Sequence, residues 1–165
     1  METYKSESEI NELVESFIDT NLPKEKWTHG AHLTTAIWHL KSYDFYEALC
    51  LIKCRIIAYN LSVGGVNNSS MGYHETLTVF WMKVVYFYTT NHKQKTLVET
   101  CNSFLNSQLS TRELPFYFYE KEKLMAAKAR AIYMECNRTE FDYGTLGKIL
   151  RNEIVILKQD SSAIL

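Results

Sequence analysis

Residues that interrupt helices are scarce in this sequence. It has two prolines and six glycines among 165 residues, so most of the chain is free to form long helices. Apolar residues recur at helical spacing along most of its length, and no segment shows the strict alternation of a half-buried strand. The sequence therefore predicts an all-α protein, a single-domain bundle of about seven helices over residues 1–165, with 158–165 as a loose tail.

The sequence also lacks a segment able to cross a membrane. A bilayer-spanning helix needs roughly 18 or more apolar residues, and the longest apolar run, Leu77 to Tyr88, is interrupted by Thr78 and Lys83. Residues 1–8 are polar and acidic, unlike a secretory signal. We therefore expect a cytoplasmic protein that does not bind membranes.

An excess of either charge is missing as well. The formal net charge is −1 and no basic stripe is visible, so we expect no nucleic-acid partner. The four cysteines, at positions 50, 54, 101 and 136, include no CxxC pair, which favours buried free thiols in a reducing compartment over a disulfide framework. The motifs of a serine nucleophile elbow and of a phosphate-binding glycine loop are absent too.

The sequence does contain helical periodicity with recognisable helix starts, among them the favoured N-cap residue Thr28. Helices are expected over about 7–19, 28–41, 44–61, 73–90, 94–108, 120–136, and from 139 or 144 to 158, the last with Thr139 and Asp142 as a weak capping box. Residues 62–72 form a long polar loop, a kind of segment that is often functional. Residues 114–119, LPFYFY, are expected to be an extended aromatic connector, because proline disfavours helix in the residue before it.

Two short patterns place histidines in the first turn of a helix. In WTHGAH, His29 and His32 are three residues apart, so they share a helix face that points towards the interior. In GYHET, His74 precedes Leu77 and Trp81 at helical spacing and can also face inward. The positive end of a helix disfavours imidazolium, so these histidines should stay neutral, the form that binds a metal ion or acts as a base.

Three interpretations of these histidines stay open. His29, His32 and His74 could ligate a divalent metal ion, with Glu75 or a loop asparagine as a fourth group, although Glu75 falls away from the helix stripe of His74. The same residues could line a metal-free substrate pocket. They could also be ordinary half-buried side chains that hydrogen-bond between helices.

Other polar residues have simpler interpretations. His39 and His92 are expected at helix ends, where the helix dipole favours histidine. Arg55 and Arg130, each the lone cation on the inner side of its helix, are expected as buried ion-pair partners. Asn60 is expected either to cap its helix or to hydrogen-bond in a pocket.

Several of these motifs resemble those of a family of small, largely uncharacterised bacterial proteins. The matching stretches are WTHxxHL at Trp27 to Leu33, YN at Tyr59-Asn60, YHETxTxFW at Tyr73 to Trp81, and LPxxYYxxExL followed by AR at Leu114 to Arg130. The last stretch departs from the family pattern, with Phe118-Tyr119-Glu120 where the family tends to have Tyr-Tyr-Ser. The resemblance implies that the histidine segments and the aromatic connector belong together, and it supplies no mechanism.

The favoured hypothesis is a small-molecule-binding helical protein with an internal His/Glu pocket, which would act as an enzyme if one histidine serves as a base. The candidate catalytic residues are His29, His32, His74 and Glu75. The candidate pocket walls are Trp27, Asn60, Tyr73 and Trp81, with 62–72 as a lid. The alternative is a non-enzymatic interaction module that contacts a protein or a second copy through residues 116–119 and the helix after them, and a divalent metal and a homo-oligomer both stay open.

Overall fold

The fold is all-α, as predicted. A computed structural model describes residues 3–157, and the tail expected at 158–165 lies outside the described residues. No strand occurs within residues 3–157. The helices are α1 (Glu7–Ile18), η1 (Lys24–Lys26), α2 (His29–Ser42), α3 (Phe45–Ser62), α4 (Glu75–Asn91), α5 (Leu97–Leu105), η2 (Gln108–Ser110), α6 (Leu114–Phe118), α7 (Lys121–Leu124), α8 (Ala127–Ala131) and α9 (Tyr143–Leu150).

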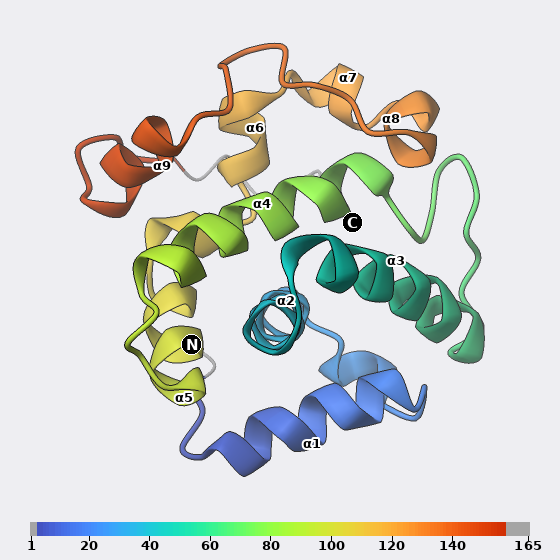
Figure 1. The fold of residues 1–165 in the computed structure, drawn as a ribbon. Coiled ribbons are helices and arrows are strands. Elements are labelled where there is room, and N and C mark those ends of the chain that lie inside the picture. Colours follow the sequence, from blue (N-terminus) through green and yellow to red (C-terminus); the bar gives the residue numbers. More distant parts are fainter. Residues whose placement is uncertain (1–2, 158–165) are drawn as a thin grey trace.

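Helix α2 is the centre of the bundle. It is seen nearly end-on in Figure 1, with α1, α3, α4 and α5 around it, and it packs against all four. Its side chains Leu33 and Ile37 are buried in the main core. Helices α6 to α9 lie on the side of α4 that faces away from α2 (Figure 1). Both sides of α4 are therefore covered, which explains why its sequence is apolar nearly all round.

Local capping residues fix where the long helices begin. The Thr28 hydroxyl accepts a hydrogen bond from the backbone N–H of Ala31, and Asp44 accepts from those of Tyr46 and Glu47. Thr96 forms a capping box with Glu99 at the start of α5. Each such cap contributes about 1 kcal/mol and satisfies backbone donors that have no partner inside the helix. The predicted starts of α2 and α3 are confirmed.

The segment after residue 113 differs from the prediction. The expected extended connector at 114–119 is instead the short helix α6, because Pro115 sits in its first turn, where proline is well tolerated. The expected helix over 120–136 is broken into α7 and α8. Beyond α8 the chain is no longer helical. There, the hydroxyl of Thr76 in α4 donates to the carbonyl oxygen of Ile132 and accepts from the backbone N–H of Met134, which ties residues 132–134 to α4.

The end of the last helix and the exposure of two cysteines also differ from the prediction. Helix α9 is capped by Asp142, whose carboxylate accepts from the backbone N–H of Thr145, and it ends at Leu150. All four cysteines are free thiols, but Cys50 and Cys54 are exposed on α3 and not buried as expected. Among the described residues, no helix combines the length and the apolar character needed to cross a membrane.

Candidate functional site

A cavity of about 340 Å³, here called the inner cavity, lies between α2, α3 and the start of α4. Every predicted pocket wall lines it, as do all three candidate histidines; the carboxylate of Glu75 does not. The lining residues are Trp27, His29, His32, Leu33, Ala36, Ile52, Ile56, Asn60, Gly72, Tyr73, His74, Leu77, Thr78, Trp81 and Met82. The predicted histidines and walls thus lie together at one cavity, although His29 and His74 are 45 positions apart in the sequence; the walls from α3, Ile52 and Ile56, were not predicted.

His32 is the histidine that the cavity leaves accessible. Its side chain is exposed, and its ring lies edge-on to Trp27 with 3.9 Å between ring centroids. Within residues 3–157 its ring makes no hydrogen bond. Burial in the surrounding protein lowers the pKa of His32 to about 3, with further lowering by the nearby His29 and Arg112. His32 is therefore neutral at pH 7.

His29 is oriented by the segment that follows α5. Its Nε2 atom lies 2.9 Å from the carbonyl oxygen of Ser110, and because a carbonyl only accepts, Nε2 carries the proton and donates. The ring also meets the edge of Trp81, with 5.0 Å between centroids. His29 thus forms part of the cavity wall, and Ser110 sets its direction.

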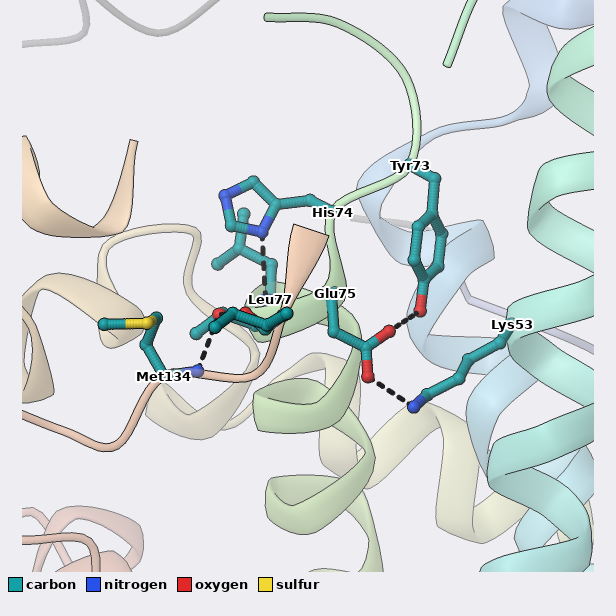
Figure 2. Close-up of polar contacts among 8 residues, drawn as sticks. Lys53, Tyr73, His74, Glu75, Leu77 and Met134 are labelled. Atoms are coloured by element: carbon teal, nitrogen blue, oxygen red, sulfur yellow. Dashed lines mark hydrogen bonds and ion pairs between the residues drawn. The ribbon is translucent and has the colours of Figure 1, made fainter. Parts of the chain in front are cut away.

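His74 has a structural role that its sequence pattern did not reveal. It is the N-cap residue of α4, where its Nδ1 atom accepts from the backbone N–H of Leu77 at 3.3 Å (Figure 2). Its Nε2 atom donates to the carbonyl oxygen of Leu124 at 2.9 Å. Burial lowers the pKa of His74, and Arg130 lowers it further, against the opposing effect of the Leu124 carbonyl. Both ring nitrogens are occupied, so His74 is not available as a base or a metal ligand while α4 is capped.

Glu75 points away from the cavity, as its helical angle indicated. Its carboxylate forms an ion pair with Lys53 of α3 and accepts a 2.5 Å hydrogen bond from the hydroxyl of Tyr73 (Figure 2). Burial raises the pKa of Tyr73, and the hydrogen bond to Glu75 raises it further. The predicted catalytic role of Glu75 is therefore not supported by its position: it holds Tyr73 in the cavity wall.

The three-histidine metal site is not formed. Among residues 3–157, no group of three or more His, Cys, Asp or Glu side chains is arranged to hold a metal ion. The physical reason lies in the partners just described, because His74 uses one nitrogen for Leu77 and the other for Leu124. The metal interpretation of His29, His32 and His74 is corrected accordingly.

The loop between α3 and α4 is built around Asn67. Its side-chain oxygen accepts from the backbone N–H of Tyr73 at 2.8 Å and from the side-chain amide of Asn60 at 3.2 Å. Gly72 has φ +80°, and a Cβ there would lie 2.1 Å from the carbonyl oxygen of Val66. Only glycine fits this position. Asn60 is therefore a loop anchor as well as a cavity residue.

Sequence reasoning missed the part played by Arg130. Its Nη1 atom donates to the carbonyl oxygens of Gly72 and Tyr73, at 3.2 and 3.4 Å, and so fixes the end of the loop. Within the described residues it has no carboxylate partner, contrary to the expected ion pair, and its Nε atom is buried without a hydrogen bond. The one available signal was a single cation on an apolar segment, which does not specify whether the acceptor is a carboxylate or a backbone carbonyl.

A second buried histidine lies outside the cavity. His39 lies in the last turn of α2, as expected for a helix-end residue, and it is fully buried; its Nδ1 atom donates to the carbonyl oxygen of Thr35, and its Nε2 atom accepts from Arg55. Arg55 thus bonds an imidazole in place of the predicted carboxylate. His92 follows α4 as expected, where its Nδ1 atom donates to the carbonyl oxygen of Tyr88.

The aromatic connector is part of the core. Phe116, Phe118 and Tyr119 are buried, and only Tyr117 of the 116–119 group is half-exposed. Their rings are therefore not displayed to a partner. The other part of the surface in the interaction-module alternative, the segment after residue 119, forms the short helices α7 and α8.

Comparison with known proteins adds no further assignment. No family model, no curated protein and no solved structure matches this chain. The resemblance to the bacterial family therefore depends on the motif residues alone. Trp27, His29, His32, Asn60, Tyr73, His74 and Trp81, which carry much of that resemblance, all line the inner cavity.

Proposed function

We propose that this protein binds a small, largely apolar molecule in the inner cavity, with His32 as the polar contact. The single observation that carries the proposal is the cavity itself: about 340 Å³, with aromatic and aliphatic walls and an accessible imidazole that has no hydrogen-bond partner within residues 3–157. Ligand pockets in proteins typically occupy about 300–1,000 Å³ and combine apolar walls with a few oriented polar groups.

The walls supply affinity and His32 supplies orientation. Apolar ligand surface removed from water contributes roughly 25 cal/mol per Å², whereas one hydrogen bond adds only about 1 kcal/mol net. A neutral imidazole offers one donor and one acceptor, so it can pair with a hydroxyl, carbonyl or amide group of the ligand. The oriented side chains Tyr73 and His29, each held by a hydrogen bond of its own, keep the wall rigid.

Binding is better supported than histidine-base catalysis. A general base is most effective when its pKa lies near the working pH, and the pKa of His32 is lowered to about 3. At pH 7 such a group is fully deprotonated but a weak proton acceptor. His74, a second candidate base in the cavity wall, has both nitrogens in hydrogen bonds, and His29, the third, donates from Nε2 to the carbonyl oxygen of Ser110.

The test is a fragment screen by ligand-observed NMR, repeated with a variant that fills the cavity. Ala36 is buried in the cavity wall, so Ala36→Phe should displace every cavity ligand. Ala58→Phe, on the exposed face of α3, is the matched control and should keep them. Thermal unfolding of both variants checks that they remain folded. Fragments that bind Ala36→Phe as well as the parent protein would contradict the proposal, as would a screen without hits.

A further inference from the structure

His29 and Leu33 stand between two hollows. On one side they line the inner cavity, and on the other they line an outer groove of about 290 Å³. The start of α2 forms one wall of this outer groove, and Leu105, Ser110 and Arg112 form the opposite wall. The partition between the two spaces thus consists of side chains from one turn of α2.

The two hollows have a common electrostatic character. No Asp or Glu side chain lines either of them in the part of the chain that the structure describes. Arg112 is the single Lys or Arg among their lining residues; it is exposed, and no carboxylate lies within salt-bridge distance of it in residues 3–157. Its charge acts through the partition, because it helps to keep His32 neutral on the inner side.

We propose that the inner cavity and the outer groove form one elongated site for an amphipathic acid, with an apolar, ring-containing body in the inner cavity and a single anionic group at Arg112. This rests on the proposed function of the inner cavity and adds the ligand's charge and direction. A guanidinium that has no carboxylate partner among the described residues, next to described walls without Asp or Glu, favours a carboxylate over a neutral group and disfavours a cation. The aromatic walls at Trp27 and Trp81 suit a flat ring system.

Three compounds that share one apolar ring system distinguish the elongated acid site from the simpler binding function proposed for the inner cavity. 1-Naphthylacetate, 1-naphthylacetamide and 2-(1-naphthyl)ethylamine carry charges of about −1, 0 and +1 near pH 7, as expected for an acid, an amide and an amine. Isothermal titration calorimetry at low salt should show the acid binding at least about ten-fold more tightly than the amide, and the amide more tightly than the amine. If the acid and the amide bind equally, the proposed charge preference is overturned while the cavity's binding function stands. If none of the three binds, both fail.

Variants then locate each end of the ligand. Arg112→Gln should lower the affinity for the acid to that for the amide and leave amide binding unchanged. Lys41→Gln is the matched control, because it removes one positive charge at the far end of α2, about 18 Å from His29 along the helix axis. Ala36→Phe should abolish binding of both compounds. Unchanged acid affinity in Arg112→Gln, or retained acid affinity in Ala36→Phe, would overturn the elongated site.

Discussion

The ring of His74 joins the start of α4 to the end of α7. One nitrogen accepts from the backbone N–H of Leu77, and the other donates to the carbonyl oxygen of Leu124, a residue 50 positions away along the chain. A histidine that the sequence presents as a candidate ligand is thus a helix cap and an interhelical tie. The chemistry of the cavity is left to His32 and His29.

His74→Ala should therefore destabilise the fold. Loss of the cap costs about 1 kcal/mol, and the unpaired carbonyl of buried Leu124 adds roughly 1–3 kcal/mol. His74→Asn restores a good cap residue but not the tie to Leu124, so it should fall between the parent protein and His74→Ala. Urea unfolding followed by circular dichroism measures all three. Equal stability of His74→Ala and the parent protein would show that the two bonds do not matter.

The buried His39, which is hydrogen-bonded to the half-buried Arg55, should make stability depend on pH. Burial, with a smaller contribution from Arg55, lowers the pKa of His39 from 6.5 to about 4 in the folded protein. Between these values the unfolded chain binds a proton that the folded chain does not, so the free energy of unfolding falls as pH falls from about 6.5 to about 4. The full effect is about 3 kcal/mol, from 1.36 kcal/mol per pKa unit.

Urea unfolding between pH 7.5 and 4 tests this effect. His39→Gln should be less stable than the parent protein at pH 7.5 and should show a flatter pH dependence, because glutamine does not titrate. His92→Gln is the control, since His92 is only half-buried, and it should keep the slope of the parent protein. A His39→Gln variant with the parent slope would assign the pH dependence to other groups.

Direct titration checks the neutral state of His32. In ¹H–¹³C NMR spectra of the imidazole rings, its Cε1–Hε1 signal should stay at the neutral position down to about pH 4, since its pKa is lowered to about 3 by burial and by His29 and Arg112. The signal is assigned by its absence in His32→Asn. A midpoint near the ordinary value of 6.5 would mean that the ring is well hydrated and unaffected by its surroundings, which would weaken its proposed place in the cavity.

Gly72 should tolerate no side chain. Its φ of +80° and the 2.1 Å approach of a Cβ to the carbonyl oxygen of Val66 combine backbone strain with a clash. We expect Gly72→Ala to destabilise the protein by about 2 kcal/mol or more, within or above the usual cost of a strained non-glycine residue. Gly64→Ala separates the two effects, because Gly64 also has positive φ, +72°, but nothing lies within 4 Å of its Cβ position. Equal losses in the two variants, measured by urea unfolding, would leave no role for the clash.

The ion pair of Lys53 and Glu75 should contribute to stability. Lys53→Met leaves the carboxylate of Glu75, whose side chain is only 18% exposed, without its cation. A double-mutant cycle with Glu75→Gln should give a coupling free energy of about 1 kcal/mol, typical of a partly exposed pair. Glu75→Gln should keep ligand binding, because Glu75 does not line the cavity and the amide oxygen of glutamine can still accept the hydrogen bond from Tyr73. Additive losses in the cycle would deny the coupling, and loss of binding with an intact fold would return Glu75 to the functional site.

The residues around the cavity show how far local patterns can carry a prediction. Thr28 marks the start of α2, and the three-residue spacing of His29 and His32 puts both on the cavity side of that helix. These features depend on backbone geometry within one turn, which the sequence specifies directly. The hydrogen-bond partners of the same rings do not follow from it: Ser110 is 81 residues from His29, and Leu124 is 50 residues from His74.

The region after residue 113 shows where local sequence patterns fail to predict the structure. The apolar spacing of 120–136 is compatible with a continuous helix, yet Thr76 draws the backbone of Ile132 and Met134 into hydrogen bonds with α4 and helix ends at Ala131. Whether this segment stays helical depends on a hydrogen-bond partner that is distant in the sequence, so local helix propensity does not predict where the helix ends.

The sequence by itself determined the all-α class, the starts of α2 and α3 and the inward-facing positions of His29 and His32, because periodicity and capping act within a few residues. The tertiary structure alone decided which imidazole is accessible, which ones are held by backbone carbonyls, and that Arg112 lies across the partition from His32. Those properties depend on packing between segments far apart in the chain. That packing sets the burial and the nearest charge of each imidazole, and these decide its protonation state and which of its nitrogens is available.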